Sequence, residues 1–428
     1  MFLATILLAL AYALAYLPGE TSFLAGLEHA KWLLAYTLVT GLLLWRIAQP
    51  GNRTLPALSL LALLLLLAAG PGGWVWGRDP ELIVFPLAAI LLLITLVPAI
   101  STHGTAALNA LAAAALLLYP IGALGGLGLL PALGYTPFLD RTAEYFPRAF
   151  TWPSPGYAAG VFAPLAALLL VRSHQAQRPL FLFGAAVLLA LMLGGGNRTG
   201  PAAALFASLL VAPLIAGRDP RGWARLLGRW GLALGLALVL FALYPLPGTR
   251  PTTLERDLHD LPTFNSRIYL WQGALAVLRD HPLGVGPDRF LGVLALSHPD
   301  LAERMVRALA AVPREASRIE FLSDTPLVRV ELPGRDRPVF FRLGSALAHN
   351  GFLDLALVYG LPIAVLVFLA WIGWMVRLYR HRRFELLAMN LALFLYALLW
   401  TPIFSVLFPF VAIHRLVQGE RGQGVGAG

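Results

Sequence analysis

Apolar segments of helix length fill most of this chain, and they constrain its fold more than any other feature. Hydrophobic residues make up 58% of the 428 residues, whereas charged residues make up only 13%. A soluble domain has nearer half of its residues apolar and about a quarter charged. A helix needs about 20 mostly apolar residues to cross a bilayer. We therefore predict an all-α polytopic membrane protein with about twelve transmembrane helices.

The candidate spans divide the chain into two helical regions separated by one long loop. They cover residues 2–17, 30–47, 55–69, 82–100, 105–124, 157–171, 180–193, 201–216, 231–244, 351–376, 384–400 and 403–413. The first has no basic residues before it and no good cleavage site, so we expect a retained helix. The predicted domains are helices 1–9 in residues 1–244, the loop in 245–350, helices 10–12 in 351–417 and a flexible cytoplasmic tail in 418–428.

The arginines predict the orientation of these spans. Basic residues gather in short cytoplasmic connections of membrane proteins. If the spans are right, the alternate short connections hold only Arg78, Arg141, Arg148 and Arg198. The other arginines outside the long loop fall on one side: Arg46, Arg53, Arg172, Arg178, Arg218, Arg221, Arg225, Arg229, Arg377, Arg380, Arg382, Arg383, Arg415 and Arg421. Both termini are then cytoplasmic and the long loop is external. This bias also explains much of the net charge of +10 without a nucleic-acid partner.

The long loop, residues 245–350, is the only extended polar segment, and it holds more than half of the 22 acidic residues. Its pattern predicts a small folded domain. Asn265 and Ser266 can cap a helix over residues 267–280, whose apolar face would hold Ile268, Trp271, Leu275 and Leu278. A turn-rich stretch over 333–336 predicts a hairpin between residues 328–332 and 338–342.

A second helix is expected in this loop near Asp300. Its apolar stripe is Leu301, Met305, Leu309 and Val312, with Arg304 and Arg307 away from it. Such a basic amphipathic helix can lie on a lipid surface. It can equally pack on the loop's own core, and the sequence leaves both alternatives open.

Three external residues are candidates for chemistry. Arg198 lies in a glycine-rich turn between two spans, and Arg267 begins the first loop helix. The planar guanidinium forms two parallel charged hydrogen bonds with phosphate groups, so a pair of arginines suits a diphosphate. His349 precedes Asn350, a natural N-cap, and histidine can accept a proton near neutral pH. Asp354 could orient His349 or favour the helix N-terminus. The ordinary alternatives are a loop arginine, a solvated arginine and an interfacial histidine.

Other chemistries have less support in the sequence. There is no cysteine, which excludes a thiol nucleophile, a disulfide framework and a thiolate metal site. Asp257, His259 and Asp260 are close together but lie in a linker rich in proline and threonine. We therefore expect neither a catalytic metal nor a cofactor.

Several motifs together resemble the O-antigen ligase and polymerase superfamily. They are NSRIYLWQGAL at 265–275, DHPLGVGPDRF at 280–290, AHNGFLD at 348–354 and YGLP at 359–362. The family pattern runs roughly Arg-x-x-x-Trp, Pro-Leu-x-Gly-x-Gly, then His-Asn ahead of a span with Gly-Leu-Pro. NRTG at 197–200 is similar to the family's Ser-Arg-Gly turn, with asparagine for serine and one residue inserted. The match covers mainly residues 193–376.

The resemblance implies a metal-independent, inverting glycan transfer at the outer face of a bacterial inner membrane. The donor would be an undecaprenyl diphosphate-linked glycan. Arg198 and Arg267 would bind its diphosphate, with Arg289 as a weaker candidate for a third contact. His349 would activate the acceptor hydroxyl, with Asn350 and Asp354 in support.

The resemblance leaves the acceptor open. A ligase transfers to lipid A-core or another final acceptor, a polymerase to a second lipid-linked repeat unit, and a protein O-oligosaccharyltransferase to a protein. One long loop favours the ligase. A solute transporter is the alternative of a different class, but transporters usually hold ionisable residues at mid-membrane, and the predicted spans have few.

Overall fold

The computed structural model describes about half of the chain. The described residues are 112, 116, 119–120, 136–137, 145–146, 155–194, 197–243, 262–286, 289–308, 316–322, 327–334, 337–342 and 348–399. The first four predicted spans, the last one and the tail lie outside these residues. Two short strands, β1 (Thr136–Pro137) and β2 (Tyr145–Phe146), pair antiparallel between the fifth and sixth predicted spans.

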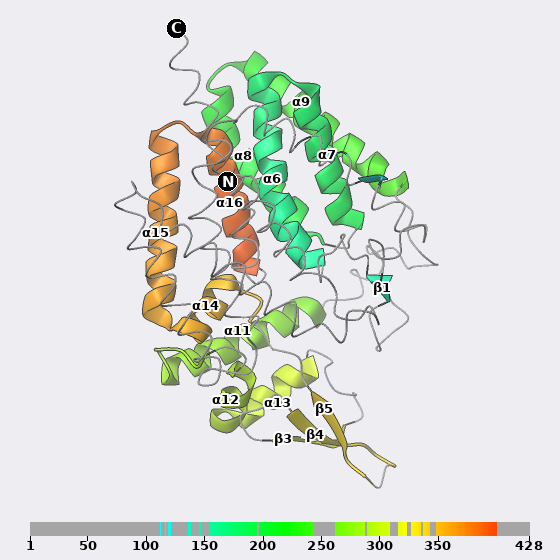
Figure 1. The fold of residues 1–428 in the computed structure, drawn as a ribbon, viewed down its shortest axis with the longest axis vertical. Coiled ribbons are helices and arrows are strands. Elements are labelled where there is room, and N and C mark those ends of the chain that lie inside the picture. Colours follow the sequence, from blue (N-terminus) through cyan, green and yellow to red (C-terminus); the bar gives the residue numbers. More distant parts are fainter. Residues whose placement is uncertain are drawn as a thin grey trace, which may run out of the picture.

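A bundle of apolar helices forms the larger part of the described structure (Figure 1). Its helices are α6 (Pro155–Ala176), α7 (Pro179–Gly194), α8 (Thr199–Ala216), α9 (Pro220–Leu243) and α16 (Phe384–Leu399). They are rich in leucine and alanine, and they share one continuous core. Short turns join α6 to α9 in succession, which makes neighbours antiparallel. Four predicted spans therefore correspond to α6, α7, α8 and α16.

Within the described residues, three helices are long and apolar enough to cross a membrane: α8, α9 and α15 (Leu361–Arg380). Helices α7 and α16 are shorter but also apolar. Many large apolar side chains of α9 and α15 are exposed, among them Leu232, Leu238 and Leu366. Exposed apolar faces of this extent are expected of helices that contact lipid, so the structure supports a membrane protein.

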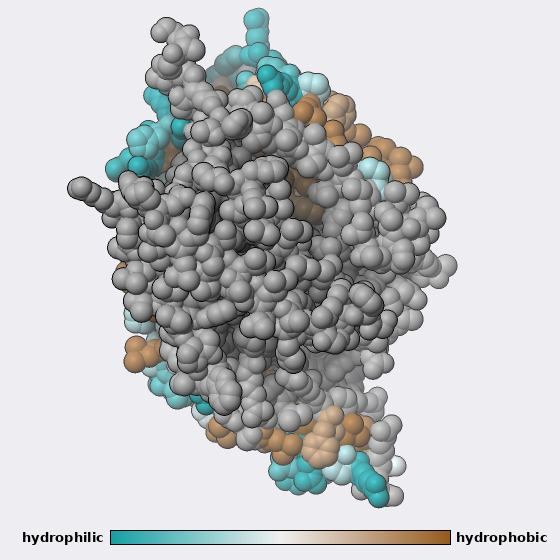
Figure 2. Space-filling view, viewed as in Figure 1, coloured by the Kyte–Doolittle hydropathy of each residue, from teal (hydrophilic) through white to brown (hydrophobic). Residues whose placement is uncertain are grey.

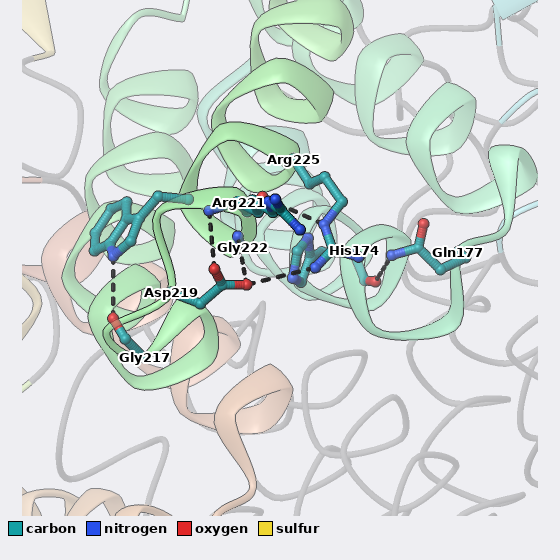
Figure 3. A network of polar contacts seen from close by, with 8 residues as sticks. His174, Gln177, Gly217, Asp219, Arg221, Gly222 and Arg225 are labelled. Atoms are coloured by element: carbon teal, nitrogen blue, oxygen red, sulfur yellow. Dashed lines mark hydrogen bonds and ion pairs between the residues drawn. The ribbon is translucent and has the colours of Figure 1, made fainter.

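The arginine-rich connections lie together at one end of the bundle. Arg229 of α9 donates to the carbonyl of Ser173 near the end of α6, and the Trp230 indole donates to Leu170 O at 3.2 Å. The close-up in Figure 3 shows Asp219 and Arg225 of the α8–α9 region beside His174 of α6. In Figure 2, hydrophilic residues gather at the upper end, where the α15–α16 turn also lies. The predicted same-side grouping holds for these described connections.

Two span boundaries predicted from hydropathy are wrong. The segment 351–376 is not one helix but two, α14 (Gly351–Tyr359) and α15, separated at Gly360. Gly360 has φ +97°, a conformation that stops a helix and that residues with a Cβ rarely adopt. Helix α9 begins at Pro220 rather than 231, so Arg221, Arg225 and Arg229 lie on its first turns instead of in a loop. Proline at a first helical position explains the early start.

The long loop folds into a small domain at the opposite end of the bundle (Figure 1). It contains α11 (Pro262–Asp280), α12 (Phe290–Ser297), α13 (Pro299–Ala308), β3 (Arg318–Phe321), β4 (Leu327–Glu331) and β5 (Val339–Arg342). The strands form one antiparallel sheet in the order β3-β4-β5. The predicted hairpin is confirmed as β4–β5, with Val330 opposite Val339. Strand β3 and helix α12 were not predicted.

Other details of the loop prediction need correction. Helix α11 starts at Pro262, so Asn265 and Ser266 lie inside it and do not cap it. Its buried face contains Leu270, Ala274, Val277 and Leu278, whereas Leu275 is exposed. The sequence left open whether the apolar stripe of α13 lies on a lipid surface or packs on the core of the loop domain. Met305 is fully buried in that core, so the helix packs there. Leu309 and Val312 lie outside the described residues.

Candidate functional site

The turn between α7 and α8 holds Arg198 through its neighbour Asn197. The Asn197 side chain accepts a hydrogen bond from Gly200 N at 2.8 Å, in the first turn of α8. Its amide nitrogen donates to the hydroxyl of Tyr396 on α16 at 3.1 Å. A Cβ on Gly200 would lie 2.6 Å from the Met192 sulfur, so the turn is tightly packed. Arg198 itself is exposed beside this anchored residue.

Arg267, which belongs to the loop domain, places a positive charge near Tyr396. It lies in the second turn of α11 and is partly buried. Burial lowers the pKa of Arg267, and the nearby Tyr396 phenol offsets part of this effect. Arg267 and the Asn197 turn therefore approach the same tyrosine, although one belongs to the loop domain and the other to the bundle.

His349 has a constrained backbone. Its φ is +51°, which is uncommon for a residue other than glycine. The Ala348 N–H before it donates to Asp354 Oδ1 at 2.6 Å, and Asn350 after it caps α14 by accepting from Phe352 N and Leu353 N. Unfavourable backbone conformations persist where surrounding contacts enforce them, often at functional sites.

His349 is also close to Arg267. Burial, and then the positive charge of Arg267, lower the pKa of His349 to about 4. Both causes disfavour the imidazolium form. The side chain is therefore neutral at pH 7, with a nitrogen lone pair available as a proton acceptor.

The structure places Arg267 close to His349, and it links the turn that carries Arg198 to the same region through Asn197 and Tyr396. Arg198 is adjacent to Asn197, which contacts Tyr396; Arg267 interacts with Tyr396 and with His349. Asn350 also joins the start of α14 to the end of α16, because its side-chain amide donates to Leu398 O at 3.0 Å. The cluster lies where the loop domain meets the bundle end opposite the arginine-rich turns (Figure 1).

The supporting candidates have different positions. Asp354 is buried, and its carboxylate holds the backbone at Ala348, so it acts on the conformation that precedes His349. Arg289 is the exposed N-cap residue of α12. The acidic residues at 257–260 lie outside the described residues.

The turn that contains Gly284 and the segment that contains Gly360 both belong to the family pattern, and their backbones contact each other. Val285 N donates to Leu357 O at 2.7 Å, and Leu361 N donates to Pro282 O at 2.8 Å. A Cβ on Gly284 would lie 2.7 Å from Gly360 N, and one on Gly360 would lie 2.9 Å from Leu283 O. Both glycines have positive φ. The pair joins the end of α11 to the α14–α15 break and so fixes the loop domain over the bundle.

Sequence reasoning missed Tyr396 and the role of Asn197. Tyr396 is 2% exposed and lies near the C-terminal end of an apolar helix. A hydroxyl in such a helix is a weak signal, because tyrosine is also common at membrane interfaces. The contact with Asn197, 199 residues away in the chain, and the proximity of Arg267 identify it as part of the site.

Comparisons with known proteins do not assign this chain to a family. No family model matches it, and no curated protein is significantly similar. The family resemblance therefore depends on the short motifs, and the function is a proposal.

Proposed function

We propose that this protein is a membrane glycosyltransferase that moves a glycan from undecaprenyl diphosphate to an acceptor hydroxyl. It would act at the outer face of a bacterial inner membrane, with both termini in the cytoplasm. The arrangement that supports this best is partly buried Arg267 near His349, in a loop domain that is hydrogen-bonded to the start of an apolar helix.

The two arginines suit a diphosphate leaving group. A charged hydrogen bond from arginine contributes about 1.5–3 kcal/mol, and partial burial of Arg267 removes competing water. Charge that develops on the departing diphosphate is stabilised by groups already in position. This pair needs no metal ion for that task, and the resemblance points to metal-independent chemistry.

His349 suits the second requirement, removal of the acceptor proton. In the proposed step, the acceptor oxygen attacks the anomeric carbon as its proton passes to the imidazole of His349. The bond from the anomeric carbon to the diphosphate oxygen breaks, and undecaprenyl diphosphate leaves as the anion held by Arg198 and Arg267. Attack opposite the leaving group inverts the anomeric configuration. A positioned general base typically contributes about 10²–10⁴ in rate.

Donor binding would also improve His349 as a base. A group with a pKa near 4 is a weak proton acceptor at neutral pH. The diphosphate brings negative charge between the arginines, which opposes the effect of Arg267 and raises the histidine pKa. The site would thus become more basic only when the donor is present.

The preferred acceptor is a final one, as in an O-antigen ligase, because one long loop covers the bundle. A polymerase and a protein O-oligosaccharyltransferase use the same donor chemistry. Purified protein would be mixed with a lipid-linked donor and, separately, with lipid A-core, a second lipid-linked repeat unit or an acceptor protein. Single transfer to lipid A-core is the expected result, and a ladder on the lipid carrier would indicate polymerisation. EDTA should leave the rate unchanged.

Solute transport is the competing function. Within the described spans the buried polar groups are few, namely Ser173, Ser208, Glu385 and Asn390, and Glu385 lies in the first turn of α16. Uptake of solute by proteoliposomes, with no glycan transfer to any acceptor, would overturn the proposed function.

A further inference from the structure

The turn over residues 282–286 presents an exposed leucine at the start of a candidate span. Leu283 is 78% exposed. The turn has little freedom to move, because Pro282 O accepts from Leu361 N and Val285 N donates to Leu357 O. Leu361 N belongs to the first turn of α15, where amides have no partner within the helix. The loop domain and the first turn of α15 are therefore one rigid unit at this point.

The backbone of this leucine lies against the start of α15, whose own apolar side chains are also exposed. Leu361 and Ile363 are each 45% exposed, and Leu366 one turn further is 66% exposed. Helix α15 is long and apolar enough to cross a membrane. The turn itself, residues 281–286, contains no acidic residue or arginine; Arg279 and Asp280 precede it in the last turn of α11, and Asp288 and Arg289 follow it in the sequence. A single exposed leucine needs no explanation. A leucine that is exposed beside the apolar surface of a membrane span does need an explanation.

We propose that the Pro282–Leu283 turn inserts into the acyl boundary of the leaflet in which α15 begins. Its partner is the lipid acyl layer, which removes the exposed leucine side chain from water. The loop domain is then held to the membrane surface as well as to the helices. This sets the height of α11, and of Arg267 on it, relative to the lipid surface.

The absence of cysteine from the chain makes the test direct. Leu283→Cys would be labelled with an environment-sensitive nitrobenzoxadiazole probe and reconstituted into vesicles of phosphatidylethanolamine and phosphatidylglycerol. Leu366→Cys on α15 serves as the lipid-facing reference. Arg337→Cys, exposed beside the β4–β5 hairpin, serves as the water-facing reference. Quenching by spin-labelled lipids and by aqueous iodide would be measured for all three.

The expected result is that the Leu283→Cys probe is quenched by spin-labelled lipid as strongly as the Leu366→Cys probe, and is protected from iodide. Quenching by iodide to the extent of the Arg337→Cys probe would overturn the proposal. Protection from both quenchers would also overturn it, because the turn would then be covered by protein. Repeating the measurement at several protein-to-lipid ratios identifies a second copy as that cover. None of these outcomes depends on the glycosyltransferase function.

Discussion

The side-chain amide of Asn197 lies 3.1 Å from the hydroxyl of Tyr396, 199 residues further along the chain. This contact joins the α7–α8 turn, which carries Arg198, to the end of α16, which Arg267 approaches from the loop domain. It therefore connects the two arginines proposed to bind the diphosphate. The contact suggests a role for Tyr396 in positioning, since the residue is almost fully buried.

Tyr396→Phe should weaken donor binding several-fold without loss of folding, because it removes the partner of Asn197 and keeps the ring. Asn197→Ala should also lower stability by about 0.5–2 kcal/mol, since the first turn of α8 loses its side-chain cap. Binding of undecaprenyl diphosphate and thermal unfolding in detergent measure the two effects. Tyr379→Phe, on an exposed tyrosine of α15, is the control. Unchanged binding in Tyr396→Phe would show that the hydroxyl has no positioning role.

Arg267→Gln should weaken binding of undecaprenyl diphosphate by roughly tenfold to a hundredfold, from the loss of about 1.5–3 kcal/mol per charged hydrogen bond. Arg198→Gln should act in the same direction. The control is Arg304→Gln, an exposed arginine on α13. If all three variants lose affinity equally, the effect is one of general charge and the two assigned contacts are wrong.

His349→Ala should slow glycan transfer by about 10²–10⁴, the usual contribution of a general base. Donor binding should be retained, because the arginines hold the diphosphate. Single-turnover transfer and donor binding, measured on the same preparation, separate the two steps. A variant that transfers at the wild-type rate would refute the base assignment.

The pH dependence follows from the lowered pKa of His349. A histidine with an unfolded pKa of 6.5 and a folded pKa of about 4 binds its proton more readily in the unfolded chain. Its contribution to stability is therefore complete above pH 6.5 and declines as the pH falls from 6.5 to about 4.

For transfer, kcat/KM should keep its value down to about pH 4, because it reports the free enzyme. The acid limb of kcat should lie at higher pH, since bound diphosphate raises the histidine pKa. Coincident limbs would contradict that effect.

Gly284→Ala should detach the loop domain from the α14–α15 break. Gly284 has φ +84°, and its added Cβ would meet Gly360 N at 2.7 Å. Gly334→Ala is a matched control, because Gly334 also has positive φ (+76°) but has open space around it. The control therefore shows the backbone cost alone, about 1–2 kcal/mol. Limited proteolysis of the loop and thermal unfolding should show a larger effect for Gly284→Ala; equal effects would remove the steric argument.

Hydropathy and residue type were enough to predict a helical membrane protein, the position of the long loop and the main candidates for its chemistry. Long apolar segments can be stable only in lipid or in a large helical core, so composition and hydropathy predict the helices. The helices at Pro155, Pro179 and Phe384 and the β4–β5 hairpin follow from such local patterns. Arg198, Arg267 and His349 were identified because their residue types suit a diphosphate and a hydroxyl proton.

The way in which these parts meet depends on contacts between residues that are distant in the sequence. Hydropathy treats 351–376 as one span because leucine and valine continue past Gly360, but the approach of Leu283 to Gly360 requires a break there. The buried face of α11 depends on which side α12 and α14 occupy, which periodicity alone does not specify. Tyr396 joins the site only because α16 ends beside Asn197. These contacts connect residues far apart in the chain, and no local pattern encodes them.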